Sequence, residues 1–405
     1  MRKLSLAFLL FSSLNAEFEV AGHVDVELQE FLDRPEDKNK NAITAKQVLE
    51  LTYTNDALTL FTQAYAQEAY YDLTSQKKTE RTFARLDEFY AKYDFDEDAI
   101  KIGKSIEFWG SLELRNIVDG FNPNDFRDDL FANSKLGVWN LNLSHYTETG
   151  EISLLVKFEE QDQKMAAFPY VYYFFPEIVT YHSALHTKGS KYRPSVYLKY
   201  SGSTDTEYAL DYAFIYENGY DSQRYFELDK LSGDFRQAAY IVNKLMTYNT
   251  LVLGSALIKL EALYAKVDKN PYVGDYSHIA VGVEYTLENV YESAALGLIA
   301  EYYRYDTHES DKYNDLELFE TMQNDLFIGA RYSFNNENDA SLIGGGIFDG
   351  EYDEEVYYLK YESRFMEKYK VAFDYYYIDP SKKEKTAYSL MGIHQRVGLN
   401  IAYYF

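Results

Sequence analysis

The chain has 405 residues and is rich in aromatic side chains, with 42 Tyr and 26 Phe. It carries 65 acidic and 40 basic residues, which gives a formal net charge of −25, and it contains no cysteine. The missing thiols exclude a disulfide scaffold and a thiolate metal site, and the strong negative charge argues against a nucleic-acid partner.

Mean hydropathy is −0.42 although 46% of the residues are hydrophobic. Apolar and charged residues must therefore be finely interleaved along the chain. Beyond the N-terminus the sequence has no run of about 18 apolar residues, which excludes a helical membrane protein.

The N-terminus has the features of a secretory signal peptide. A cationic start, Met1-Arg2-Lys3, precedes an apolar stretch that is too short to span a membrane as a stop-transfer helix. Ala16 offers the small residue expected at a cleavage site. We therefore predict a cleaved signal peptide over residues 1–16 and an exported domain over 17–405. The alternative is a buried N-terminal helix.

The rest of the chain alternates with a period of two. In the final segment, 395–405, one parity is apolar (Val397, Leu399, Ile401, Tyr403, Phe405) and the other is polar or small (Arg396, Gly398, Asn400, Ala402). Because successive side chains of a strand point to opposite faces, this pattern predicts a strand with one apolar face. The same alternation recurs in 208–216, 258–264, 279–285, 294–302, 326–334 and 371–377.

Three features favour a membrane barrel over a soluble β-sandwich. The alternating segments are about ten residues long, which suits a tilted strand that crosses a bilayer. Tyrosines recur at the ends of the apolar sets, as expected for the aromatic girdle of a barrel. All seven prolines lie outside or at the edge of these segments, as a closed sheet without edge strands requires.

We predict an all-β fold, a single transmembrane antiparallel β-barrel of about 18 strands, with about 16 as the alternative count. The expected strands are 18–31, 43–53, 57–71, 81–93, 99–109, 135–146, 151–160, 195–202, 206–217, 235–247, 256–267, 276–286, 293–304, 325–334, 339–349, 354–363, 369–378 and 395–405.

The connections between these strands alternate in length. Tight turns at 54–56, 147–150, 202–205 and 335–338 alternate with longer loops near 110–134, 161–194, 218–234, 305–324 and 379–394. Short periplasmic turns and long extracellular loops are typical of barrels in the outer membrane of Gram-negative bacteria, which is the location we expect.

The chain ends on Phe405, at the close of an amphipathic strand. This ending resembles the C-terminal signal that outer-membrane barrels present to their assembly machinery. The expected partners are that machinery, outer-membrane lipid, lipopolysaccharide and small hydrophilic solutes. A monomer and a homotrimer are both open.

The region from Ala99 to Asp125 reads AIKIGKSIEFWGSLELRNIVDGFNPND. Its Gly103-Lys104, Trp109-Gly110, Asp119 and Asn122-Pro123-x-Asp125 resemble a pattern in porin-like outer-membrane barrels of the alginate-export type and their uncharacterised relatives. The resemblance implies a single-chain channel of about sixteen to eighteen strands. It does not specify a substrate.

If the apolar parity faces lipid, the opposite parity lines a pore. The charged residues of that parity are Lys199, Asp211, Lys259, Glu261, Glu284, Glu301, Arg331, Asp374 and Arg396. Acidic groups in a pore favour cations, and neighbouring basic groups create a transverse field. The alternative is that such charges only form cross-strand ion pairs that stabilise the wall.

The loop 161–194 is unusually aromatic for an extracellular loop. We expect it to fold into the barrel mouth and narrow the channel through Phe168, Tyr170, Tyr172, Tyr173, Phe174 and Phe175. A contact with a partner protein and a latch between subunits are the alternatives.

Motifs for metal or catalytic chemistry are weak. Asp94-x-Asp96-x-Asp98 begins like a calcium loop, but Ala99 and Ser105 stand where such a loop needs Gly and Glu. No phosphate-binding loop, dinucleotide fingerprint or nucleophile elbow is present. We expect no metal, no cofactor and no catalytic residues.

These observations predict a porin-like channel for passive diffusion of small hydrophilic solutes, with some preference for cations. A substrate-specific outer-membrane transporter or exporter is the first alternative. A barrel enzyme is the second, although no histidine can be paired with a nucleophile from the sequence.

Overall fold

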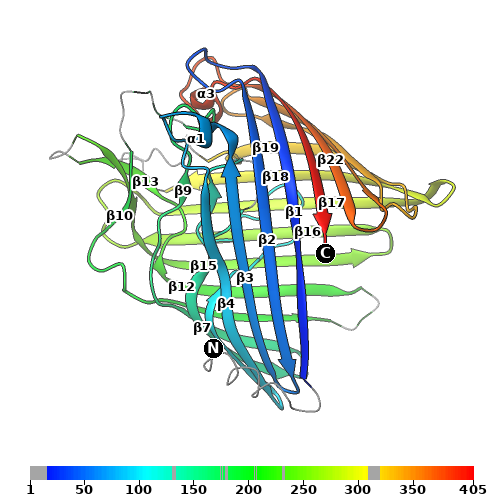
Figure 1. Cartoon of the computed structure of the whole chain (residues 1–405). Helices are drawn as coiled ribbons and strands as arrows, with labels where there is room; N and C mark the ends of the chain where they lie inside the picture. Colours follow the sequence, from blue (N-terminus) through cyan, green and yellow to red (C-terminus); the bar gives the residue numbers. More distant parts are fainter. Residues whose placement is uncertain are drawn as a thin grey trace, which may run out of the picture.

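The computed structural model describes residues 16–129, 134–173, 175, 177, 181–204, 206, 208–229, 233–308 and 320–405. Within these residues eighteen antiparallel strands form one sheet, which closes into a barrel because the first strand pairs with the last (Figure 1). The barrel strands are β1 (Ala16–Asp33), β2 (Asn41–Asn55), β3 (Leu58–Ala69), β4 (Phe83–Phe95), β5 (Asp98–Ser105), β7 (Val138–Thr147), β8 (Gly150–Lys157), β11 (Ser195–Ser203), β12 (Leu210–Tyr220), β15 (Ile241–Leu253), β16 (Ala256–Val267), β17 (Tyr276–Tyr291), β18 (Ala294–Thr307), β19 (Asn324–Ser333), β20 (Ser341–Asp349), β21 (Glu355–Phe365), β22 (Tyr369–Asp379) and β23 (Gln395–Tyr404).

The two ends of the barrel differ. Short connections lie at one end, called here the turn end, and long connections lie at the other, called the loop end (Figure 1). The smaller elements all belong to the long connections: the helices α1 (Tyr70–Thr74) and α3 (Ala387–Met391), the sheet of β10 (Tyr181–Thr187), β14 (Phe235–Ala239) and β13 (Tyr225–Leu228), and the paired segments β6 (Asp125–Phe126) and β9 (Lys164–Met165).

The predicted all-β fold, the antiparallel barrel and the count of eighteen strands are confirmed. The largest difference in strand bounds concerns the predicted strand 235–247. Its first part, β14, leaves the barrel and pairs with β13 and β10, while the barrel strand is β15 and pairs with β12 and β16. The apolar periodicity continues through both segments, so it could not show that the chain leaves one sheet for another.

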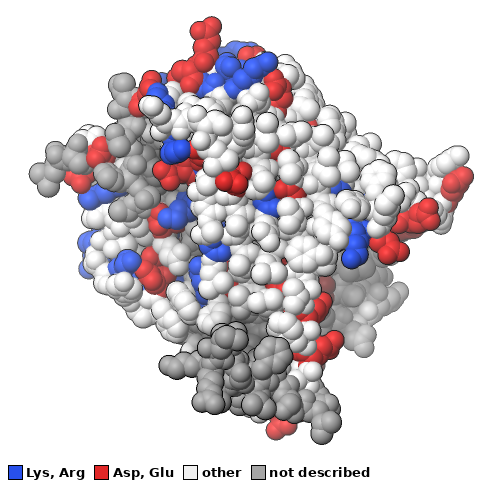
Figure 2. Space-filling model, viewed as in Figure 1, with Lys and Arg blue, Asp and Glu red and all other residues white. Residues whose placement is uncertain are grey.

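The outer face of the barrel is apolar. On β17 the outward side chains Ile279, Val281 and Val283 are 42–44% exposed, whereas their inward neighbours His278 and Ala280 are 3% and 0% exposed. In Figure 2 the wall that faces the viewer is mostly uncharged, and acidic and basic side chains gather around the loop end and on the protruding hairpin at the right. A continuous apolar belt of this kind suits contact with lipid acyl chains.

We expect Val281→Arg to destabilise the folded barrel by about 2–4 kcal/mol, because it places a cation in the middle of the lipid-facing belt. Thr250→Arg is the control, since Thr250 pairs with Lys259 on the inner face. Urea unfolding in lipid vesicles measures both. Equal destabilisation of the two variants would contradict the assignment of the faces.

No helix in the described part of the chain combines the length and the hydropathy that a membrane span requires. The predicted signal peptide lies outside the described residues except for Ala16, which begins β1. At the other terminus the backbone N–H of Phe405 donates to the Gly22 carbonyl (3.1 Å), beside the seam between β1 and β23.

Candidate functional site

The inner face of the barrel, turned toward its axis, carries all nine charged residues of the predicted pore-lining set. Residues opposite each other in neighbouring strands share a face, and the register pairs Glu261 with Ala280, Gly282 with Glu301 and Gly297 with Arg331. The same register continues around the wall to Lys199, Asp211, Lys259, Glu284, Asp374 and Arg396.

The segment 106–126, called here the inserted segment, lies inside the barrel. Its Trp109, Val118 and Phe121 are buried against inner-face residues of the strands from β7 to β18. Its Leu112 is buried in a second cluster with inner-face residues from β17 to β22. The sequence predicted a long loop near 110–134, and a long connection does join β5 to β7. The sequence analysis did not predict that this connection folds into the barrel.

Two carboxylates on the wall hold the backbone of the inserted segment. Glu261, on β16, accepts hydrogen bonds from the N–H groups of Ser111 (2.7 Å) and Ile117 (2.8 Å). It also lies within 3.3–3.4 Å of the N–H groups of Leu112 and Val118. The two short bonds join a carboxylate to backbone N–H groups that lie outside any strand, so this contact is strong and directional.

Glu301, on β18, holds the neighbouring stretch in the same way. It accepts hydrogen bonds from the N–H groups of Glu113 (2.6 Å) and Leu114 (3.0 Å), and from the Tyr303 hydroxyl (2.7 Å). A Cβ at Gly282, which pairs with Glu301, would lie 2.8 Å from the Leu112 side chain. Glycine at this position therefore lets the inserted segment approach the wall closely.

A chain of ion pairs continues from the inserted segment along the wall. Glu113 pairs with Arg331, which also lies 3.6 Å from Glu284, and Glu284 accepts a hydrogen bond from Lys259 (3.1 Å). Three of the predicted pore-lining residues, Lys259, Glu284 and Arg331, are thus paired with charged protein partners.

The motif that resembles porin-like barrels shapes this inserted segment. Asp119 accepts a hydrogen bond from the Trp109 N–H (3.0 Å) and pairs with buried Lys135. The Asn122 side chain accepts from the Glu107 N–H (2.8 Å) and donates to the carbonyls of Ser105 and Leu136. These motif residues therefore help to fix the shape of the segment that folds into the barrel. Their place in the sequence did not indicate this role.

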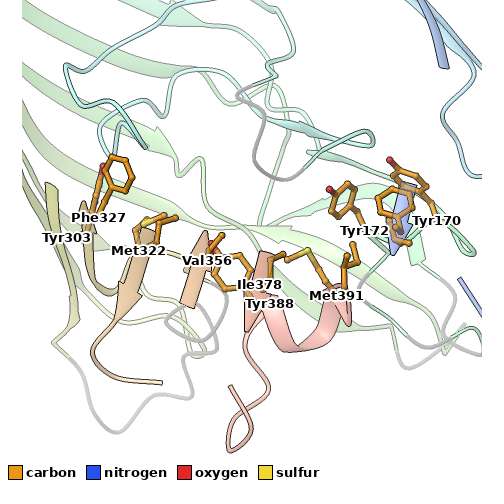
Figure 3. Packing of buried hydrophobic residues seen from close by; sticks show 14 of the residues in the cluster. Tyr170, Tyr172, Tyr303, Met322, Phe327, Val356, Ile378, Tyr388 and Met391 are labelled. Atoms are coloured by element: carbon orange, nitrogen blue, oxygen red, sulfur yellow. The ribbon is translucent and has the colours of Figure 1, made fainter. Parts of the chain in front are cut away.

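A second segment, 164–173, also reaches the inner wall. The Tyr170 hydroxyl donates to Gln29 (2.8 Å), and the Tyr172 hydroxyl accepts a hydrogen bond from Arg396 (2.8 Å). Both rings meet Phe31 edge to face, with centroids 6.0 and 6.2 Å away. Figure 3 shows these tyrosines in one cluster with wall residues such as Ile378 and with Met391 of α3.

The other residues of the predicted constriction loop lie differently. Phe168 is partly exposed, with the ammonium groups of Lys38 and Lys77 over its ring, and Tyr173 is buried. Phe175 packs on Phe226 and Phe235 of the small loop-end sheet. Phe174 lies outside the described residues. The insertion therefore involves the first part of the predicted loop.

Arg396 anchors the second segment to the wall. Its guanidinium donates to Asp129 (2.6 Å), Tyr172 (2.8 Å) and Asp374 (2.8 Å), and it lies 4.4 Å from the centroid of the Tyr376 ring. Arg396 is 4% exposed, so this is a nearly dry ionic contact.

The Gly344-Gly345-Gly346 run lies in β20, and its pairing with both neighbouring strands is regular. Gly345 is on the inner face opposite Gly329, and a Cβ on either glycine would lie 2.4 Å from the Phe327 ring. Glycine at these two positions therefore lets the Phe327 ring pack closely against the inner wall.

One sector of the wall stays polar and in contact with water. This polar sector consists of the inner faces of β1 to β5 and includes Glu27, Lys46, Arg85 and Lys101. Their side chains are 15–18% exposed. On the opposite wall the charged side chains Lys157, Glu217 and Lys244 are only 1–3% exposed.

Charges of the polar sector are arranged in pairs. Lys46 donates to Glu27 (2.7 Å), Arg85 donates to Asp87 (2.6 Å), and Lys101 pairs with Glu107 of the inserted segment. Tyr65 and Phe83 stack with centroids 5.7 Å apart, and the Arg85 guanidinium lies 4.7 Å from the Tyr65 centroid. A solute that follows this sector meets both signs of charge across a short distance.

A closed eighteen-strand barrel with an outward apolar belt and segments folded into a polar interior is the fold of porin-like outer-membrane β-barrels. No family model and no curated protein matches the sequence.

Solved structures match the whole fold. OccK8 (OprE) of Pseudomonas aeruginosa has 9% identity and a TM-score of 0.55, covering 96% of this chain and 98% of that chain. OccK5 (OpdH) of the same organism has 10% identity and a TM-score of 0.54, with the same coverage. Wzi, an outer-membrane protein of Escherichia coli, has 11% identity and a TM-score of 0.53, covering 99% of this chain and 87% of that chain. The resemblance to porin-like outer-membrane barrels is thereby confirmed at the level of the fold.

Proposed function

We propose that this protein is a narrow channel for passive diffusion of small hydrophilic solutes, and that the path follows the polar sector. The observation that carries the proposal is that the paired side chains Glu27, Lys46, Arg85 and Lys101 of the polar sector stay 15–18% exposed. By contrast, Lys157, Glu217 and Lys244 on β8, β12 and β15 are only 1–3% exposed. Eighteen strands enclose more space than wall side chains can fill. The inserted segment occupies one side of that space and the second segment covers Gln29 and Phe31 of β1, which leaves the rest of the polar sector for water.

A preference for cations follows from how the interior charges are compensated. Glu50 accepts a hydrogen bond from the Gln63 amide (2.7 Å), and Glu261 and Glu301 accept bonds from backbone N–H groups. By contrast, Lys46, Lys101 and Lys259 each have a carboxylate partner. These carboxylates, which have no basic partner among the described residues, leave a net negative charge inside the barrel. This charge lowers the free energy of a cation in the lumen.

Single-channel recording in a planar bilayer tests the proposal. We expect stepwise conductance and, in a KCl gradient, a reversal potential displaced toward the value for K⁺. A reversal potential displaced toward the value for Cl⁻ would refute the cation preference. A protein that inserts stably but carries no current would refute the channel.

A substrate-specific transporter is the second candidate. Wzi is described as a carbohydrate-binding barrel involved in capsule assembly, and this chain exposes Tyr192 (63%) and Tyr272 (52%) in its loop-end connections. Exposed aromatic rings suit stacking on sugars. Saturable block of the current by one oligosaccharide would favour this candidate over unselective diffusion.

A further inference from the structure

A separate cavity of about 440 Å³ opens at the turn end of the barrel. It lies beside the β7–β8 and β11–β12 turns, and β7 pairs with β5, the last strand of the polar sector. Its lining includes the acidic residues Glu151 and Asp211 and the inner-face tyrosines Tyr146 and Tyr248. None of the ten residues that line it, all in the described part of the chain, is basic. Its volume is within the range of small-molecule sites.

The two carboxylates are oriented by hydroxyl donors. Glu151 accepts hydrogen bonds from Ser144 (2.6 Å) and Ser153 (2.7 Å), and Asp211 accepts one from Ser203. These bonds fix the carboxylates without neutralising them. Lys199 and Lys92 act electrostatically on Glu151 from outside the lining.

The strand register gives the separation of the two acids. Glu151 is opposite Ser201, and Asp211 is opposite Ser203, so the acids are two strands apart with an offset of two residues. Two strand spacings of about 4.8 Å and two steps of about 3.4 Å place their Cα atoms about 12 Å apart. A single ammonium group cannot meet both carboxylates, whereas the two ends of a linear polyamine can.

We propose that this turn-end cavity binds a linear aliphatic polyamine. The terminal ammonium groups pair with Glu151 and Asp211, and the methylene chain lies along the tyrosine rings, whose faces attract cations. The inference extends the proposed channel function, because a polyamine held at this mouth would hinder the passage of other cations. A neutral sugar would gain nothing from the two fixed carboxylates, and an anion would be repelled.

Titration of the detergent-solubilised barrel with spermidine, followed by calorimetry, tests the site directly. We expect saturable binding that weakens about tenfold in Glu151→Gln and in Asp211→Asn, the loss expected for one charged contact. Glu362→Gln is the matched control, because it removes one inner-face carboxylate on β21, away from the cavity, and should leave the affinity unchanged. No binding, or equal weakening in all three variants, would overturn the inference.

Current recording separates this inference from the channel proposal. We expect spermidine to block the wild-type current and to block Asp211→Asn only at about tenfold higher concentration. Conductance without spermidine binding would overturn the cavity assignment alone. Calorimetric binding to a barrel that carries no current would support the cavity and overturn the channel.

Discussion

Replacing both Glu261 and Glu301 by alanine is expected to free the inserted segment and raise single-channel conductance several-fold. The two carboxylates accept hydrogen bonds from the backbone N–H groups of Ser111, Ile117 and Glu113, with N···O distances of 2.6–2.8 Å. Without these acceptors the N–H groups lose their partners in a confined interior, which costs about 1–3 kcal/mol for each buried group. The segment would then sample positions outside the lumen and leave a wider path.

The double glutamine variant is the control for this experiment. Glutamine keeps a carbonyl oxygen at each position, so it should retain part of the contact and give a smaller increase. Protease sensitivity of the segment 106–126 in folded barrels provides a second readout. If conductance and cleavage both match wild type in the alanine variant, these carboxylates do not hold the segment.

Arg396→Ala is expected to lower the free energy of unfolding by about 3 kcal/mol. The substitution leaves Asp129 and Asp374 without the cation that both contact, and it removes the donor to Tyr172. Breaking a buried pair costs about 3–5 kcal/mol, and the lower end applies because the Asp374 side chain is 24% exposed. Urea unfolding in lipid vesicles measures the change.

Arg396→Lys tests whether the planar guanidinium matters, since its two terminal nitrogens reach acceptors on three different residues. Lysine keeps the charge but cannot reach three acceptors from one planar group, so we expect an intermediate loss of stability. A loss below about 1 kcal/mol for Arg396→Ala, the size typical of an exposed ion pair, would show that the contact is solvated and does not anchor the second segment.

The two loop predictions illustrate where sequence reasoning reached its limit. The aromatic density of 161–194 suggested insertion, and Tyr170 and Tyr172 do lie on the inner wall. The long loop near 110–134 was also predicted, but nothing in its composition indicated that residues such as Trp109, Leu112 and Phe121 pack against the inner wall. Composition shows how apolar a loop is. Whether the loop folds into the barrel depends on whether the inner wall provides hydrogen-bond partners for its backbone.

The sequence by itself determined the barrel. The number of strands, their approximate positions and their lipid-facing parity follow from alternation within about ten consecutive residues, and the charged inner-face residues follow from the same parity. The bounds near 235–247 do not, because the alternation continues from β14 into β15. These features are local, so a single segment such as 276–286 can be read without knowledge of its neighbours.

Only the tertiary structure decided what the inner face contacts. Glu261 meets Ser111, which is 150 positions away in the chain, and Glu301 meets Glu113 at a separation of 188. No periodicity within a strand encodes a contact over that distance. The path of water through the barrel depends on such contacts, because they determine which part of the wall the inserted segments cover.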